Sequence, residues 1–341
     1  MTKGSVLVTG GAGYIGSHTL RALARAGWRP VAFDDLSLGF AEAAKGFELI
    51  EGDVRDGPAL SRAIEAHGAV AVIHLAGLIE VARSVSRPDL FWDSNVAGTA
   101  ALLSAMRAHA VPRLVFSSSA AVYGHVAGAA GEKPLTEDLP KAPASPYGDT
   151  KLAGERMIAA HCAAFGLTAI ALRYFNAAGA DPSGELGEAH EPETHLIPLA
   201  IDAALGQRGP LTVFGTDFPT PDGTCVRDYI HVSDLAEAHV AALEAPRAAG
   251  AFEPLNVGTG RGWSVLEVIA AVERALGRPV PRALGPRRAG DPPSLVANPA
   301  RALERLEWRP KSSSLDEIVA SAARWHRAPR YGKRGLGGDG P

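Results

Sequence analysis

Cysteine is scarce in this sequence, with only Cys162 and Cys225 among 341 residues. Two cysteines cannot supply a disulfide framework, so we expect a reducing, cytoplasmic environment. Long apolar runs are also missing, since stretches such as residues 69–79 fall well short of the ~20 residues that a membrane helix needs. The apolar N-terminus is interrupted by glycines within its first ten residues, which makes it a poor signal peptide.

A surplus of positive charge is absent as well. The chain has 34 Lys and Arg against 37 Asp and Glu, for a formal charge of −3. A protein that coats nucleic acid would be strongly basic, so we expect neither a nucleic-acid nor a membrane partner. The composition is that of a globular protein, with 46% hydrophobic and 21% charged residues. At roughly 100–200 residues per domain, the length allows one large domain or two ordinary ones.

The first half of the chain alternates short β-rich runs with Ala-rich helical stretches. Apolar continuity predicts strands at residues 5–9, 30–34, 47–51, 69–75 and 113–117, and helical spacing predicts helices at 15–26, 58–67 and 95–108. Near-continuous apolar strands are typical of a parallel sheet covered by helices on both faces. We therefore expect an α/β fold with a Rossmann-type doubly wound parallel sheet.

The regular alternation of strand and helix patterns stops after residue 120. Residues 124–146 are rich in Gly, Pro and Ala and indicate a long functional loop. A helix over 147–165 and a strand over 168–174 follow, and then the alternation loosens into short segments. We expect a Rossmann domain over residues 1–175 and a smaller C-terminal α/β domain, mainly for substrate, over 176–328, with some of its segments returning to the first sheet. Residues 329–341 are expected to be a disordered tail.

A glycine-rich loop joins the first strand to the first helix. Gly10, Gly13 and Gly16 follow a G-x-x-G-x-x-G spacing, and Tyr14 and Ile15 lie within it. A pyrophosphate on the N-terminal amides of the helix needs the backbone to approach closely, which a β-carbon would prevent. The strand–loop–helix context predicts a dinucleotide site.

An acid follows at the end of the second predicted strand. Asp34 lies 18 residues after Gly16, where a carboxylate accepts hydrogen bonds from the adenosine ribose and repels a 2′-phosphate. The next residues include no arginine to receive such a phosphate, so NAD is preferred over NADP. Asp53 and Val54, after the third strand, are candidates to meet the adenine ring.

A tyrosine and a lysine stand one helical turn apart, at Tyr147 and Lys151. A tyrosine with a pKa of ~10 is a poor base at neutral pH. An ammonium one turn away and a cationic nicotinamide nearby would favour the phenolate. Ser117, Ser118 and Ser119 end the preceding strand, where side chains of a doubly wound sheet reach the active crevice, and a hydroxyl there could bind a reacting oxygen.

Together these residues resemble the extended short-chain dehydrogenase/reductase superfamily. Within it the chain resembles the UDP-glucose 4-epimerase family over roughly residues 4–326. The blocks that carry this closer resemblance are Ser117-Ser-Ser-Ala-Ala-Val-Tyr-Gly124, Ser145-Pro-Tyr-Gly148, Leu172-Arg-Tyr-Phe-Asn-Ala-Ala-Gly179 and Val226-Arg-Asp-Tyr-Ile-His-Val232.

The resemblance implies a redox-neutral reaction. Tyr147 would take the proton of the sugar 4-hydroxyl while the C4 hydride passes to NAD, and the 4-keto sugar would rotate and receive the hydride on its other face. Ser119 would hydrogen-bond the 4-oxygen, and Lys151 would hold the nicotinamide ribose and tune Tyr147. NAD would be retained and recycled, no metal would take part, and a homodimer would be the family's habit.

The resemblance also implies binding residues. The further cofactor residues are Leu75, Ala76, Gly77, Asn95, Ser117 and Tyr174. The residues implied for the UDP part of the substrate are Asn176, His195, Leu196, Thr212, Phe214, Arg227, Arg288 and Asp291. The chemistry fits this assignment, because guanidinium groups are fork-shaped donors for a diphosphate and a carboxylate accepts from ribose hydroxyls.

Three positions depart from the family pattern. Ile79 stands where many members carry a lysine near the nicotinamide, and His195 stands where asparagine is frequent. Leu295 occupies a position whose size helps to decide whether N-acetylated sugars fit, and leucine argues against them.

Other readings remain open at this point. UDP-xylose/UDP-arabinose 4-epimerisation shares every catalytic motif. A nucleotide-sugar 4,6-dehydratase would need an acid near Ser119-Ala120-Ala121, and none is there. A decarboxylase acting on UDP-glucuronate, a net dehydrogenase and a catalytically silent NAD sensor are less well supported.

Overall fold

The computed structural model describes residues 3–124, 133–288 and 291–332. Its larger part is a seven-stranded sheet in which every neighbouring pair of strands is parallel. The strands run in the order β3 (Glu48–Glu51), β2 (Arg29–Asp34), β1 (Ser5–Thr9), β4 (Ala69–His74), β5 (Arg113–Ser119), β6 (Thr168–Tyr174) and β10 (Phe252–Val257). The expected doubly wound α/β fold is thus confirmed.

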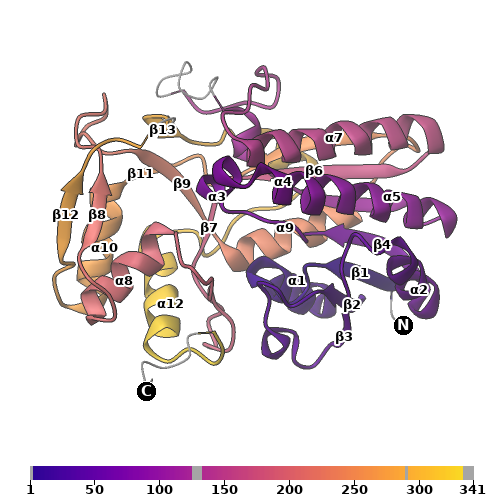
Figure 1. Ribbon diagram of the computed structural model, residues 1–341, viewed down its shortest axis with the longest axis horizontal. Coiled ribbons are helices and arrows are strands. Elements are labelled where there is room, and N and C mark those ends of the chain that lie inside the picture. The colour runs from indigo at the N-terminus through magenta and orange to yellow at the C-terminus, as the bar shows by residue number, and fades with distance from the viewer. Residues whose placement is uncertain (1–2, 125–132, 289–290, 333–341) are drawn as a thin grey trace.

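Helices cover both faces of this sheet (Figure 1). Val6 and Val8 of β1 join one hydrophobic core with helices α1 (Tyr14–Arg25), α9 (Val232–Glu244) and α11 (Ala300–Arg305). Leu7, between them, joins a second core with α2 (Gly57–His67), α5 (Gly98–Ala108) and α7 (Pro146–Phe165). Alternate residues of a strand point to opposite faces, so an unbroken apolar run is needed to fill both cores.

Smaller sheets lie beside the large one, on the left in Figure 1. The central strand β9 (Val226–His231) pairs with β7 (Asn176–Ala178), β11 (Gly262–Ser264) and β13 (Ser294–Leu295). Strands β8 (Leu211–Phe214) and β12 (Arg282–Gly285) form a separate parallel pair. Helices α8 (Leu196–Leu205), α10 (Val265–Leu276) and α12 (Leu315–Arg327) pack together into a third core with β8.

Short helical segments complete the described chain. They are η1 (Ala41–Ala44), α3 (Val81–Ser86), α4 (Pro88–Phe91), η2 (Trp92–Ala97) and η3 (Ala120–Val122). The helix expected over 95–108 begins as the wide π-turns of η2 and becomes α-helical at Gly98. No helix of the described residues is both long enough and apolar enough to cross a membrane.

Two expectations need adjustment at the level of local structure. Sequence periodicity missed α8, α9 and β10, and β10 returns to the edge of the large sheet beside β6. The tail expected from residue 329 is packed as far as residue 332, because Tyr331 lies against Trp325, with ring centroids 4.8 Å apart, and its hydroxyl donates to the Gly187 carbonyl at 3.0 Å. Residues 333–341 of that tail, and 125–132 of the long loop, lie outside the described residues.

Candidate active site

A cavity of about 350 Å3 opens over the glycine loop, next to the ends of β1, β2 and β4. Gly13 caps α1 without a side-chain hydrogen bond, so amides of the first helical turn face the loop. A β-carbon on Gly16 would lie 1.9 Å from the Gly10 carbonyl oxygen, and one on Gly10 would lie 2.6 Å from the Ala76 nitrogen. Only glycine therefore permits this close approach of loop, helix and β4, which is the cradle that a pyrophosphate needs.

Asp34 ends β2 at the wall of this cavity and is 7% exposed. One carboxylate oxygen accepts from the Ala12 amide and the other from the Leu36 amide, both at 2.9 Å. Burial raises the pKa of this carboxyl, and the two amide bonds oppose that shift. Among the described residues, no Lys or Arg pairs with Asp34. The amides fix the carboxylate so that its remaining lone pairs can accept from ribose hydroxyls.

The structure brings most of the expected cofactor residues to this cavity. Those that line it are Gly10, Gly13, Tyr14, Ile15, Gly16, Asp34, Asp53, Val54, Leu75, Ala76, Gly77, Ser117 and Tyr174. Asn95 lies behind it, where its side chain accepts from the Leu78 amide at 2.8 Å and donates to the Leu78 carbonyl at 3.1 Å. Asn95 therefore shapes the Gly77–Leu78 backbone instead of lining the cavity.

Several lining residues were not expected from the sequence. Arg55 and Arg83 bring positive charge to the cavity wall, and Leu78, Leu90, Ser94 and His190 add to it. Arg55 pairs with both Asp53 and Asp93, whereas Arg83 has a looser contact with Glu80 at 3.4 Å. Ile79, the position of the missing family lysine, also lines this cavity, so Arg83 is the nearby cation. Ile79 precedes α3 whereas Arg83 belongs to it, so helical spacing alone could not have revealed Arg83.

Tyr147, Ser119 and Lys151 meet at the ends of β5 and α7. The Ser119 hydroxyl lies beside the Tyr147 phenol and accepts from the Ala121 amide at 3.1 Å, and the Phe91 ring packs edge-on against Tyr147, with ring centroids 6.4 Å apart. The Lys151 ammonium lies 5.9 Å from the centre of the Tyr147 ring and donates to the Ser117 carbonyl at 2.9 Å. Ser145 caps α7 by accepting from the Gly148 amide, and Pro146 opens the helix, which together orient Tyr147.

The three consecutive serines have different partners. The Ser118 hydroxyl donates to the Glu155 carboxylate, which also forms a buried ion pair with Arg173. The Ser117 hydroxyl is bonded to the Tyr174 hydroxyl. Ser119 alone faces the Tyr147 phenol. Alternation along β5 sends the Ser118 side chain to the face opposite those of Ser117 and Ser119.

Burial shifts both titratable groups of this cluster. It raises the pKa of Tyr147, and the Ser119 hydrogen bond only partly opposes that shift. It lowers the pKa of Lys151 from 10.5 to about 8. Both shifts disfavour the charged forms, so the phenolate requires positive charge from outside these three residues.

A second cavity, of about 170 Å3, lies between β7, α8 and β9. All eight residues expected for the UDP part line it: Asn176, His195, Leu196, Thr212, Phe214, Arg227, Arg288 and Asp291. Asp291 contacts both arginines, with Arg227 at 3.5 Å and Arg288 at 3.1 Å, and the Arg288 guanidinium lies 4.9 Å from the Phe214 ring centre. The cavity thus combines two guanidinium groups, one acid and an aromatic face.

Arg227 and Asp228 are neighbours in the chain but do not form an ion pair in the structure. The Arg227 guanidinium donates to the Val226 and Pro292 carbonyls at 2.8 and 3.0 Å. The buried Asp228 carboxylate instead accepts from the backbone of Thr259, Gly260 and Ala297. Since consecutive residues of β9 point to opposite faces, only Arg227 reaches the cavity.

Comparisons with known proteins agree with this arrangement. The NAD dependent epimerase/dehydratase family matches residues 6–258. A UDP-glucose 4-epimerase from Azospirillum brasilense is 50% identical over 324 residues, which is 95% of this chain and 92% of that protein.

Solved structures are equally similar. The NAD complex of UDP-glucose 4-epimerase from Brucella ovis superposes with a TM-score of 0.89 at 48% identity, covering 94% of this chain and 97% of that one. The Bifidobacterium longum UDP-glucose 4-epimerase, in complex with NAD+ and UDP, gives 0.88 at 38% identity, covering 95% and 98%. On its sequence and its fold, the chain belongs to the NAD dependent epimerase/dehydratase family.

Proposed function

We propose that this protein catalyses the NAD-dependent 4-epimerisation of a UDP-sugar, chiefly the interconversion of UDP-glucose and UDP-galactose. Similarity to curated UDP-glucose 4-epimerases over nearly the whole chain supports this proposal. Neighbouring structures were solved with NAD and with UDP, which supports the same two ligands here.

One observation carries the proposal, namely that residues only two apart in the chain line the two cavities, next to the strand end that holds Ser119. Tyr174, the last residue of β6, lines the larger cavity, and Asn176, two residues later, lines the smaller one. In the sheet Tyr174 is the register partner of Ser119. A dinucleotide in one cavity and a nucleotide sugar in the other would therefore bring their reactive ends to the same place, beside the phenol.

The larger cavity fits NAD better than NADP. The glycine cradle suits the pyrophosphate, and the Asp34 carboxylate suits a free ribose 2′-hydroxyl while repelling a 2′-phosphate. Ser117 and Tyr174 line this cavity, and Lys151, which does not line it, donates to the Ser117 carbonyl at 2.9 Å; we assign these three residues to the nicotinamide end. Bound NAD supplies the hydride acceptor and donor, together with a positive charge that favours the Tyr147 phenolate.

The chain's own residues move the proton. Tyr147, as phenolate, accepts the proton of the 4-hydroxyl as the C4–H electron pair departs and the C4–O bond becomes a carbonyl. Ser119 donates to that oxygen in either orientation of the sugar. After the 4-keto sugar turns over, Tyr147 would give the proton back to the 4-oxygen, and bound NAD would supply the hydride to the opposite face of C4. Protons and electrons balance within one turnover, so no external reductant is consumed.

The smaller cavity anchors the sugar nucleotide so that the hexose can turn. Arg227 and Arg288 are positioned to bind the diphosphate, the Phe214 ring to stack on a base, and Asp291 to accept from ribose hydroxyls. Leu295 packs against the cluster around Tyr123 and Phe175, next to Arg227 in register, which supports a restricted sugar pocket. The stretch Ser119–Ala121 contains no acid to eliminate water, so dehydration is disfavoured.

The test is a panel of UDP-sugars with purified protein and no added reductant, analysed by product chromatography. We expect UDP-glucose and UDP-galactose to interconvert, and UDP-N-acetylhexosamines to react far more slowly. Turnover of UDP-pentoses alone would replace the hexose assignment with UDP-xylose/UDP-arabinose epimerisation. No turnover of any UDP-sugar would refute the proposed function.

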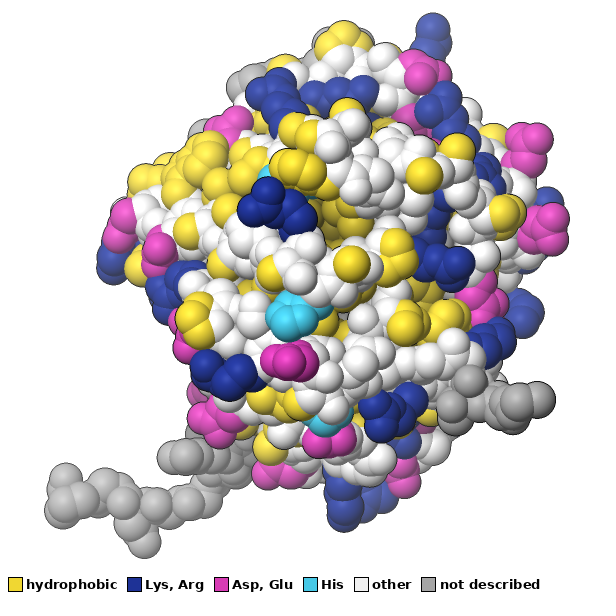
Figure 2. All heavy atoms as spheres, turned by 90° about the vertical axis from the view of Figure 1, so that its right-hand side faces the viewer, with side chains coloured by type: hydrophobic (Ala, Val, Ile, Leu, Met, Phe, Trp, Pro, Cys, Tyr) yellow, Lys and Arg dark blue, Asp and Glu magenta, His cyan; other side chains and the backbone are white. Residues whose placement is uncertain are grey.

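We also propose a cytoplasmic homodimer. Cys162 and Cys225 are both buried free thiols, which fits a reducing compartment. Val81, Val85 and Trp92, on α3 and η2, are 50%, 66% and 45% exposed, and such an apolar surface suits a second copy of the chain. Charges of both signs are interspersed on the face in Figure 2, so this face presents no broad basic surface. Light scattering should give twice the chain mass, and Val85→Asp should shift it to the monomer; a monomeric wild-type protein would contradict the proposal.

A further inference from the structure

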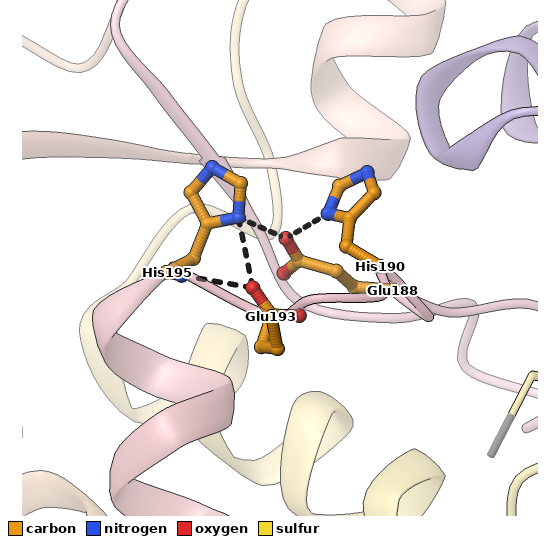
Figure 3. Close-up of side chains that lie close together, drawn as sticks. All are labelled: Glu188, His190, Glu193 and His195. Atoms are coloured by element: carbon orange, nitrogen blue, oxygen red, sulfur yellow. Dashed lines mark hydrogen bonds and ion pairs between the residues drawn. The ribbon is translucent and has the colours of Figure 1, made fainter. Parts of the chain in front are cut away.

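Two histidines and two glutamates converge at the junction of the cavities. They come from one eight-residue segment, Glu188-Ala-His-Glu-Pro-Glu-Thr-His195, which precedes α8. One candidate ligand atom from each of Glu188, His190, Glu193 and His195 lies within 4.8 Å of all the others. Figure 3 shows the four side chains pointing toward one another across the loop.

We propose that this cluster is a binding site for one divalent metal ion of the zinc class, a role that neither the epimerase reaction nor the sequence analysis required. Two imidazoles and two carboxylates are a donor set that zinc, cobalt and nickel prefer, whereas magnesium and calcium favour sites made of oxygen alone. The inference concerns this loop and does not depend on which sugar the enzyme takes.

The separations of the donor atoms suit such an ion. His195 Nδ1 lies 2.7 Å from Glu188 Oε1 and 3.1 Å from Glu193 Oε1, and His190 Nδ1 lies 3.0 Å from the same Glu188 oxygen. Ligands about 2.0–2.1 Å from a tetrahedral zinc lie roughly 3.3 Å apart, so these three pairs would need shifts of a few tenths of an ångström, and the wider pairs, up to 4.8 Å, would need the loop side chains to close by about 1.5 Å. The metal would replace the protons that now bridge these atoms.

The charge of the cluster also calls for a cation. Glu188 is 4% exposed, and no Lys or Arg of the described chain pairs with it or with Glu193. A buried carboxylate needs a strong partner, and imidazoles are the only basic side chains paired with these two carboxylates in the described chain. One doubly charged ion would neutralise both acids while leaving the imidazoles neutral, which is the form that ligates metals.

The loop around the cluster is already held in place. The Trp325 indole donates to the Glu188 carbonyl at 2.8 Å, and the Glu193 carboxylate accepts from the Thr194 and His195 amides at 2.7 and 2.8 Å. The His190 ring packs edge-on to Tyr14 of the glycine loop, with centroids 6.1 Å apart. Such supporting contacts orient metal ligands and strengthen binding.

Solvent reaches the site through a third cavity. This cavity, of about 330 Å3, is lined by Glu188, His190 and Glu193 of the cluster together with residues of α12 and its end. His190 also lines the dinucleotide cavity and His195 the substrate cavity, so the ion would clamp the loop where the two ligands meet. We assign it this positioning role and no step of the reaction.

The test uses the full-length chain without an affinity tag, stripped of metal by chelator and titrated calorimetrically with zinc chloride. We expect saturable binding of one zinc per chain in the wild type. His190→Asn and Glu193→Gln should each weaken binding at least roughly tenfold. Glu191→Gln is the matched control, because Glu191 belongs to the same loop but not to the cluster.

A second readout separates ligation from indirect effects. Cobalt chloride should give the visible absorption of a tetrahedral cobalt site with the wild type and Glu191→Gln, and not with His190→Asn or Glu193→Gln. Melting curves in chelator confirm that each variant is folded before titration. Absence of stoichiometric zinc binding, or equal zinc affinities of Glu193→Gln and Glu191→Gln, would overturn the proposal whatever the catalytic activity.

Discussion

Replacing Tyr147 with phenylalanine removes one oxygen atom and tests the proton-transfer role directly. The ring remains, so its packing against Phe91 and its 8% exposure should be kept. A positioned proton acceptor contributes about 10²–10⁴ to the rate, and we expect kcat to fall by that factor. KM should change little, because the residues proposed to bind the UDP part are untouched.

The stability of this variant should change much less than its activity. Tyr147→Phe removes a hydroxyl that lies beside Ser119, and a hydrogen bond between two such groups is worth only about 0.5–1.5 kcal/mol. At about 2–4 °C per kcal/mol for a large domain, the melting temperature should fall by only a few degrees. Activity and folding are therefore separable in this variant.

The assay is the conversion of UDP-galactose to UDP-glucose, followed by chromatography, with NAD content measured on the same sample. Tyr123→Phe is the matched control. Tyr123→Phe also removes a buried hydroxyl, which donates to the Asn256 side chain at 2.7 Å, but Tyr123 belongs to a separate hydrophobic cluster with Leu135 and Phe175. Activity of Tyr147→Phe within tenfold of wild type, or an equal loss in Tyr123→Phe, would refute the reasoning.

Two further predictions concern Lys151 and Arg227. Burial lowers the pKa of Lys151 from 10.5 to about 8, so the unfolded chain binds more protons between these values and the contribution of Lys151 to stability rises with pH across that window. Urea titrations give the free energy of unfolding of the wild type and of Lys151→Met. The difference between the two, wild type minus variant, should rise by up to roughly 3 kcal/mol from pH 8 to 10.5. A difference that does not change with pH would contradict the lowered pKa. Arg227→Ala should raise KM for UDP-galactose at least roughly tenfold with kcat nearly unchanged, because the Pro292 carbonyl holds the guanidinium at the substrate cavity; an unchanged KM would exclude a diphosphate contact.

Sequence reasoning succeeded where a local pattern has a single structural solution. An apolar run such as Ala69–His74 is too short for a typical helix and favours a buried strand, and Gly16 marks a point where no β-carbon fits. Tyr147 and Lys151 were predicted to share a helix face because four residues make about one turn.

The parts that escaped prediction depend on contacts between distant segments. Strand β10 could not be assigned to the large sheet, because its partner β6 is about eighty residues away in sequence. The three serines looked alike until Glu155 and Tyr174 distinguished Ser118 and Ser117 from Ser119. The four ligands of the proposed metal site have no helical or strand periodicity, since their convergence comes from loop backbone alone.

The route of the chain between the sheets limits how the enzyme can move. It leaves the large sheet after β6, returns through α9 and β10, leaves again for β11, and comes back once more with α11. Two domains joined by one flexible connection could move apart about a hinge. Here several backbone connections cross between the two parts, and together they restrict such a motion. Because the two parts of the protein cannot move far apart, we expect the substrate itself to rotate about its own bonds. That rotation would present first one face of C4 and then the other to the bound NAD.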